Sequence, residues 1–259
     1  MIPSTFGSLN ALKHLELGDN LLSGSLPSEL GHLHQLIGLE LPGNDLTGTI
    51  PSSFGLLLQL NTLNIQDNQL TGTIPFSIGN LELLTVLQCY INSISGSIPS
   101  SFGSLTQLTM LSMRNNMMSG AIPSSLGALQ LLEVLYLYYN ELTGTIPSTF
   151  GSLSAITDIS VYSNELVGTI PLSMGSLQSL ISLAVFRNKL TGTIPNSFGS
   201  LSLMEALYLF DNFISGTIPS TLGILEHLEV LDIHQNALTG VFPSECYTNL
   251  DIFICMRIA

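Results

Sequence analysis

Positive charge is scarce in this sequence. Five lysines and arginines stand against 18 aspartates and glutamates, which gives a formal net charge of −13, and charged residues make up only 9% of the chain. Proteins that bind nucleic acids or anionic membrane surfaces do so through clustered Lys and Arg side chains that neutralise phosphate groups. The composition therefore predicts that nucleic acid is not a partner.

Long apolar runs are absent, and cysteine is rare. No stretch of about 18 uninterrupted apolar residues occurs, and the first seven residues have neither a basic region nor an apolar core. We expect no membrane insertion in this segment and find no signal peptide in it. Of the three cysteines, Cys89 occupies a core position and should be a buried free thiol. Cys246 and Cys255 are either a disulfide in a C-terminal cap or two free thiols.

Motifs that carry catalysis or bind metals are missing as well. The sequence has no GxxxxGK[ST] phosphate-binding loop and no kinase HRD or DFG motif. Its five histidines have no metal-ligand spacing with the cysteines. We therefore predict no enzyme activity, no metal site and no cofactor.

What the sequence does have is an internal repeat of 24 residues. Three columns recur without exception. They are asparagine from Asn20 to Asn236, glycine from Gly24 to Gly240 and proline from Pro27 to Pro243. The asparagine amides are expected to bond backbone groups of their own and the adjacent repeat, as a buried ladder.

The repeat reads LxxLxLxxNxLxGxIPxxLGxL, and each part predicts local structure. The LxL core alternates apolar and variable residues, as a short strand with one buried face does. Proline and glycine exclude a long helix from the second half, so we expect 3-10 turns there. One unit cannot bury its own apolar edge, so the repeats must stack with their strands parallel. The predicted fold class is α/β, a solenoid with a parallel β-sheet on its concave face and 3-10 turns on its convex side.

The pattern NxLxGxIPxxLGxL resembles the plant-type class of leucine-rich repeats, from Ile2 to about Pro243. This class occurs in receptor-like kinase ectodomains and polygalacturonase-inhibiting proteins. The resemblance implies short second strands on the convex side of the leucine-rich repeat solenoid. It also implies an extracellular or cell-surface location within a longer parent protein, although no N-x-Ser/Thr glycosylation site occurs in the chain.

We predict a single leucine-rich repeat domain over residues 1–259. It comprises a partial repeat at 1–9, about ten 24-residue repeats over 10–249 and a degenerate C-terminal cap at 244–259. Because the sequence starts in mid-repeat without a polar cap, we expect a fragment of a longer protein or an incomplete gene model. The period places Ile252, Cys255 and Arg257 at the apolar columns of one further strand.

One exposed column of the predicted sheet is rich in aromatic residues. It begins with Gly18, Pro42 and Gln66, and from the fourth repeat onward it carries large rings. Such rings are enriched at binding hot spots, and the run from Tyr90 to His234 would cover about 29 Å at the usual strand spacing. We predict a ligand-binding surface over repeats 4–10, made of Tyr90, Arg114, Tyr136, Tyr138, Tyr139, Tyr162, Phe186, Tyr208, Phe210 and His234.

The predicted function is recognition of a protein, peptide or glycan without catalysis, and three alternatives stay open. The aromatic column could serve only to stabilise the sheet, at about 0.2–1 kcal/mol for each cross-strand contact. The chain could inhibit a secreted hydrolase, as the polygalacturonase-inhibiting relatives do. It could also be a structural or ice-contacting protein that uses two rows of threonines, interrupted at Ser95, Ala121, Val167 and Val241. The rows are Thr47, Thr71, Thr143 and Thr191, and Thr49, Thr73, Thr145, Thr169, Thr193 and Thr217.

Overall fold

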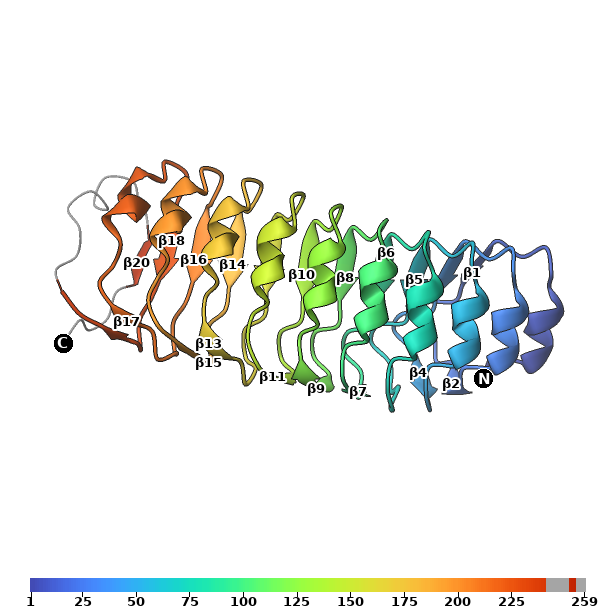
Figure 1. The fold of residues 1–259 in the computed structure, drawn as a ribbon. Helices are drawn as coiled ribbons and strands as arrows, with labels where there is room; N and C mark the ends of the chain where they lie inside the picture. The colour runs from blue at the N-terminus through green and yellow to red at the C-terminus, as the bar shows by residue number, and fades with distance from the viewer. Residues whose placement is uncertain (241–251, 255–259) are drawn as a thin grey trace.

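The computed structural model describes residues 1–240 and the backbone of residues 252–254. The chain winds in successive coils that stack in a single row, with 3-10 helices on one side and a long β-sheet behind them (Figure 1). Each coil contributes one strand to that sheet and one helix to the opposite side. The predicted solenoid is confirmed.

The main sheet has eleven strands, all parallel to their neighbours. Equivalent residues of successive repeats are paired, as Leu15 with Leu39 and Leu135 with Ile159, because the strands from β1 to β18 follow the same 24-residue step. In spatial order the strands are β1 (His14–Glu16), β3 (Gly38–Glu40), β5 (Thr62–Asn64), β6 (Val86–Gln88), β8 (Met110–Ser112), β10 (Val134–Tyr136), β12 (Asp158–Ser160), β14 (Ser182–Ala184), β16 (Ala206–Tyr208), β18 (Val230–Asp232) and β20 (Ile252–Ile254).

The last strand departs from the period. Strand β20 pairs Leu231 with Phe253, whereas the 24-residue step would pair Leu231 with Cys255. The expectation that Ile252 lies in the Leu228 column is therefore wrong, because it pairs with Val230 and the last step is two residues shorter than the others. Arg257 lies outside the described residues. Cys246, Cys255 and most of the predicted cap lie outside the described residues.

A second set of strands follows the asparagine column and forms small parallel sheets along one edge of the solenoid (Figure 1). They are β2 (Ser23–Ser25), β4 (Asp45–Thr47), β7 (Ser95–Gly96), β9 (Met117–Ala121), β11 (Glu141–Thr143), β13 (Val167–Thr169), β15 (Lys189–Thr191), β17 (Ser215–Gly216) and β19 (Ala237–Leu238). The glycine within this segment has a positive φ, as at Gly144 (φ 75°), so this column does serve turn geometry. The expected second strands are confirmed.

Each described repeat proline, from Pro27 to Pro219, precedes a 3-10 helix, as predicted. The helices are η1 (Ser4–Ser8), η2 (Ser28–His32), η3 (Ser52–Leu56), η4 (Phe76–Asn80), η5 (Ser100–Ser104), η6 (Ser124–Ala128), η7 (Ser148–Ser152), η8 (Leu172–Ser176), η9 (Asn196–Ser200) and η10 (Ser220–Ile224).

The helices pack closely because each carries a glycine. These glycines form a second column, separate from the one at the turns, and their role is close packing and not turn geometry. A Cβ atom on Gly151 would lie 2.5 Å from the carbonyl oxygen of Ser173 in the next helix. The Ser173 hydroxyl in turn donates to the carbonyl of Ser148, 2.6 Å away, and equivalent Ser or Thr hydroxyls join most of the other helix pairs. The second glycine column is thus required for close approach of neighbouring helices.

The core lies between the main sheet and the helices. Phenylalanine recurs there in alternate repeats at Phe54, Phe102, Phe150 and Phe198, and these rings are fully buried. Smaller apolar side chains fill the same position in the repeats between, so that bulky and small groups alternate along the stack. Cys89 is a buried free thiol, as expected, and burial raises its pKa to about 12.

From Asn44 to Asn236, the asparagine ladder links each repeat to the one before it. The Asn140 amide donates to the carbonyl of Leu137 in its own repeat and of Met113 in the preceding repeat, both at 3.0 Å. Its carbonyl oxygen accepts from the Met118 backbone amide at 3.0 Å. Asn20 bonds only within its own repeat and is exposed. The predicted bonding of each asparagine to two repeats is confirmed from Asn44 onward.

Candidate functional site

The outward columns of the main sheet position the candidate site. In repeat 6, Leu135 and Leu137 point into the core, so the alternating residues Tyr136 and Tyr138 project from the opposite face. The parallel ladder continues past the end of β10, where the Leu137 amide donates to the carbonyl of Ser160 at 2.9 Å. Side chains of the Tyr138 column therefore stand on adjacent backbones in register.

Five rings of this column form an unbroken stack. Ring centroids are 4.3 Å apart for Tyr138 and Tyr162, 4.1 Å for Tyr162 and Phe186, and 4.2 Å for Phe186 and Phe210. His234 continues the stack at 4.6 Å from Phe210, and the interplanar angles between neighbours are 10–13°. The near-parallel arrangement follows from the strand spacing of about 4.8 Å, which brings equivalent side chains to van der Waals distance.

Arg114 extends the stack toward the N-terminus. Its guanidinium carbon lies 3.9 Å from the centroid of the Tyr90 ring and 5.5 Å from that of Tyr138. A guanidinium within about 6 Å of an aromatic face is attracted by the ring. The column is therefore continuous from Tyr90 to His234, over seven consecutive repeats. We call these seven side chains the aromatic stack: Tyr90, Arg114, Tyr138, Tyr162, Phe186, Phe210 and His234.

Three more rings flank the aromatic stack. Tyr136 lies 5.8 Å from Tyr138, and Tyr208 meets Phe186 edge-on at 6.4 Å. Tyr139 meets Tyr138 and Tyr162 edge-on, at 5.7 and 5.4 Å. All ten residues of the predicted surface are thus neighbours in one continuous cluster. That they bind a ligand stays a prediction.

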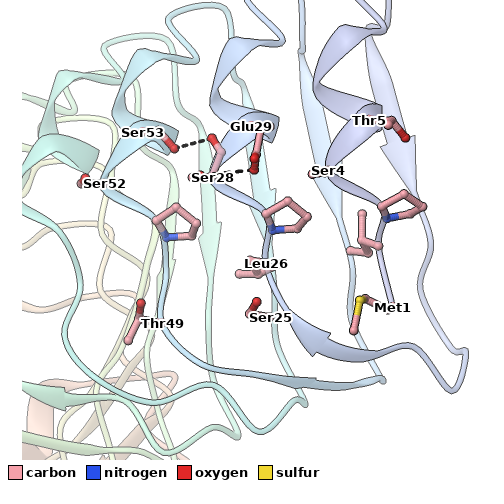
Figure 2. Close-up of a pocket in the computed structure, with 14 residues that line it drawn as sticks. Met1, Ser4, Thr5, Ser25, Leu26, Ser28, Glu29, Thr49, Ser52 and Ser53 are labelled. Atoms are coloured by element: carbon pink, nitrogen blue, oxygen red, sulfur yellow. Dashed lines mark hydrogen bonds between the residues drawn. The ribbon is translucent and has the colours of Figure 1, made fainter.

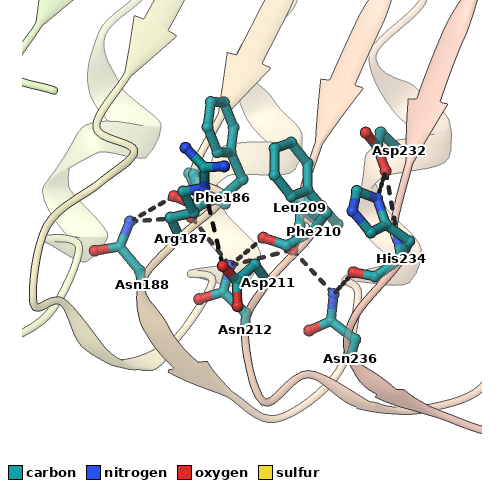
Figure 3. Close-up of polar contacts among 11 residues, drawn as sticks. Phe186, Arg187, Asn188, Leu209, Phe210, Asp211, Asn212, Asp232, His234 and Asn236 are labelled. Carbon is teal, nitrogen blue, oxygen red and sulfur yellow. Dashed lines mark hydrogen bonds and ion pairs between the residues drawn. The ribbon is translucent and has the colours of Figure 1, made fainter. Parts of the chain in front are cut away.

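The polar groups around the stack are already oriented by neighbours (Figure 3). Asp232, which is buried, accepts a hydrogen bond from Nδ1 of His234 and so holds the last ring of the stack in place. The Arg187 guanidinium lies 4.0 Å from Asp211 across adjacent turns, and both side chains are exposed. Beneath the rings, the amides of Asn188, Asn212 and Asn236 bond the backbone that carries them.

Burial raises the pKa of two tyrosines and of one carboxylate in this surface. Burial, and then the neighbouring Tyr138, raise the pKa of the Tyr162 phenol well above its ordinary value. Burial and the adjacent Asp158 carboxylate likewise raise the pKa of Tyr136. Burial also raises the pKa of Asp158, against the hydrogen bonds that favour its charged form.

Sequence reasoning missed a backbone feature that shapes one edge of the site. The residue before each ladder asparagine has a left-handed backbone, with φ of 53° at Tyr139, 51° at Arg187 and 54° at Asp211. In this conformation the chain turns sharply, and these side chains stay exposed beside the aromatic stack. Gly43, the one glycine in the column, was the available signal, because glycine marks positions of positive φ.

A separate open depression of about 810 Å³ lies over the first helices and second strands (Figure 2). Glu29 is the one acidic or basic side chain in its lining. The Ser28 hydroxyl donates to Glu29, and the Ser53 hydroxyl donates to the Ser28 carbonyl at 2.7 Å. The depression has no converging set of reactive groups, and it is distant in the fold from the aromatic stack.

The described residues contain no group of three or more His, Cys, Asp or Glu side chains able to hold a metal ion. Within the same residues, no helix is long and apolar enough to cross a membrane.

Comparison with known families gives a direct match to the repeat pattern. A family model described as a leucine-rich repeat region matches residues 3–114. A second, described as a leucine-rich repeat, matches residues 107–129, 131–153, 179–201 and 227–249. The chain belongs to the leucine-rich repeat family. No curated protein matches the sequence.

Solved structures that are similar to this leucine-rich repeat chain include plant receptor ectodomains. The Arabidopsis receptor kinase HAESA, solved with the peptide hormone IDA and a co-receptor, is 34% identical, with a TM-score of 0.91 over 96% of this chain and 42% of that one. A TDR receptor is 31% identical, with a TM-score of 0.77 over 90% of this chain and 45% of that one. The resemblance to plant-type leucine-rich repeats is confirmed, and the chain spans less than half the length of these two receptors.

A plant ice-binding protein is also similar. It is 29% identical, with a TM-score of 0.63, and the alignment covers 83% of this chain and 80% of that one. The family therefore includes proteins whose names point to different ligands.

Proposed function

We propose that this chain is a non-catalytic recognition module that binds an extended peptide or protein segment along the aromatic stack. The observation that carries the proposal is the continuity of the stack from Tyr90 to His234. Its side chains are only half-buried, so large apolar area with polar tips stays accessible on a rigid sheet. Such preorganised aromatic area binds at low entropic cost.

The dimensions of the surface favour an extended ligand. Seven strands spaced by about 4.8 Å give a length of about 29 Å, which corresponds to about nine residues of extended peptide. HAESA, the similar receptor, was solved with a peptide hormone bound, which supports a peptide as ligand class. By the same analogy we propose that the chain acts outside the cell as part of a longer ectodomain.

The test is selection of peptides from a phage-displayed library of random dodecapeptides. Binding of the enriched peptides should fall at least about ten-fold in the double variant Tyr138→Ala/Tyr162→Ala, because two adjacent rings of the hot spot are removed. Phe213→Ala is the matched control, since Phe213 is an exposed ring outside the sheet face and its loss should leave binding unchanged. If enriched peptides bind the double variant as well as the wild type, the aromatic stack is not the binding surface.

Ice contact is a second candidate, favoured by the similarity to the plant ice-binding protein. The two threonine rows are exposed, and the backbone pairing of the second strands sets a threonine of the second row beside one of the first row in the next repeat, as Thr49 beside Thr71 and Thr169 beside Thr191. The Thr71 and Thr191 hydroxyls, however, already donate to glycine carbonyls of the preceding repeat at 3.2 Å. An assay of ice-recrystallisation inhibition tests the idea. Thr145→Lys should abolish the effect, and Ser104→Lys, at an exposed site on η5, should not.

A further inference from the structure

A gap in the side-chain pattern lies beside the aromatic stack. Along the third position of strands β10, β12, β14 and β16, the register places Tyr136, Ser160, Ala184 and Tyr208 side by side. The two tyrosines are therefore separated by about 14 Å, with only small side chains between them. Both lean on the stack, Tyr136 on Tyr138 and Tyr208 on Phe186. Rings thus border this gap on three sides.

One carboxylate lies beside the gap, two residues before Ser160 on the same strand. Asp158 lies on strand β12, and its neighbours at the equivalent position of β10 and β14 are Val134 and Ser182. Its oxygen accepts a hydrogen bond from the Ser160 hydroxyl at 3.1 Å. A carboxylate offers about four acceptor sites, so hydroxyl neighbours leave part of its capacity unused.

The nearby basic side chains are committed elsewhere. Over the described part of repeats 4–10 they are Arg114, Arg187 and Lys189. Arg114 lies over the Tyr90 ring, Arg187 faces Asp211, and Lys189 pairs with Glu165. Asp158 therefore has no cationic partner within this region, although burial disfavours its charge. Two further exposed acids, Glu133 and Glu205, stand directly before strands β10 and β16 at the same side of the gap.

We propose that Asp158 receives a lysine or arginine side chain of the peptide bound along the aromatic stack. The carboxylate supplies the opposite charge, and the rings of Tyr136 and Tyr208 supply faces that attract a cation. The occupant must be cationic, because an anionic or apolar side chain would leave a partly desolvated carboxylate unpaired. This inference rests on the proposed peptide-binding function and specifies which residue the peptide must carry.

The experiment uses the whole chain and peptides enriched from the same dodecapeptide library. A basic residue should recur at one position of the enriched peptides. Asp158→Asn should weaken binding of such a peptide about ten-fold, as measured by calorimetry. The affinity for the same peptide with norleucine in place of the basic residue should not change. Glu141→Gln, which removes one exposed carboxylate on strand β11, should affect neither peptide. Circular dichroism should show that both variants are folded.

The possible failures are distinguishable. Enriched peptides that require Tyr138 and Tyr162 but have no basic preference overturn the inference and leave the proposed function standing. The same holds if Asp158→Asn weakens the basic and norleucine peptides equally, since that would be a structural effect of the substitution. If no enriched peptide depends on the aromatic stack, both the inference and the proposed function fail.

Discussion

Repeats 1–3 (residues 10–81) and repeats 4–10 (from residue 82) share one framework but present different surfaces. Both contain the buried leucine columns, the asparagine ladder and the close-packed 3-10 helices. On the outward face the first region shows Glu16, Glu40 and Pro42, whereas the second shows the aromatic stack. In a solenoid, each repeat contacts only its neighbours. The inward columns must therefore match in every repeat, while the outward columns are free to differ.

The largest effect tests whether the framework is really equal in the two regions. Phe54→Ala and Phe150→Ala should each destabilise the fold by about 3–5 kcal/mol, because each leaves a cavity at a fully buried position. Urea unfolding measures both. Phe76→Ala, at an exposed ring on η4, should change stability by less than about 0.5 kcal/mol. A much smaller cost for Phe54→Ala would mean that the first repeats unfold separately.

The next test concerns the asparagine ladder. Asn140→Ala should cost about 1–3 kcal/mol, since backbone groups of two repeats lose buried partners. Asn20→Ala should cost only a few tenths of a kcal/mol, because Asn20 is exposed and bonds one repeat. Thermal melts of the two variants provide the comparison. If Asn140→Ala and Asn20→Ala melted at the same temperature, the hydrogen bonds between repeats would not contribute to stability, contrary to this prediction.

The third test concerns the outward column of the sheet that contains Gln66 in repeat 3 and the aromatic stack in repeats 4–10. Tyr162→Ala should cost about 1–2 kcal/mol, because it removes stacking against Tyr138 and Phe186. Gln66→Ala, in the same column of repeat 3, should be neutral or slightly stabilising. The Gln66 side-chain oxygen is buried without a partner among the described residues. A similar loss of stability in Tyr162→Ala and Gln66→Ala would show that this column stabilises the sheet equally in repeats 1–3 and in repeats 4–10.

The boundary between the regions offers a test of opposite sign. Ile91 has a left-handed backbone (φ 52°), which is unfavourable for a β-branched residue. Ile91→Asn should therefore stabilise the protein by up to about 1 kcal/mol, and Ile91→Val should not. Gly43→Ala, at the equivalent position of repeat 2 (φ 61°), should destabilise it by about 1 kcal/mol. If Ile91→Asn were less stable than the wild type, backbone strain at Ile91 would be ruled out as a source of instability.

The smallest effect is pH-dependent. Because the folded-state pKa of Asp158 is raised, its contribution to stability is lost as pH rises through the unfolded-state pKa toward the folded one. Asp158→Asn should thus be more stable than the wild type at pH 7, by less than about 1 kcal/mol, and gain nothing at pH 3. Urea titrations at the two pH values measure the difference. A gain of the same size at pH 3 would point to a cause other than ionisation.

The sequence by itself determined the period, the parallel in-register sheet, the bonding of the asparagine ladder between repeats and the adjacency of the ten aromatic-surface residues. It could do so because a repeat of 24 residues brings equivalent positions together by translation, so Tyr138 and Tyr162 had to be neighbours. The same reasoning could not predict the shorter step from β18 to β20, because the 24-residue period ends before β20. Burial of the whole asparagine column was not correct, because Asn20 is exposed and Asn140 is only half-buried.

Tertiary structure alone decided how those neighbours interact. The bridging of Tyr90 and Tyr138 by Arg114 depends on the rotamer that a long side chain adopts between two rings. The left-handed backbone at Tyr139 and the role of Gly151 in helix packing depend on backbone from adjacent coils. The opening beside Asp158, between Tyr136 and Tyr208, depends on the small residues Ser160 and Ala184 of the two strands between them. These features arise from contacts between repeats, so a pattern read along one repeat does not contain them.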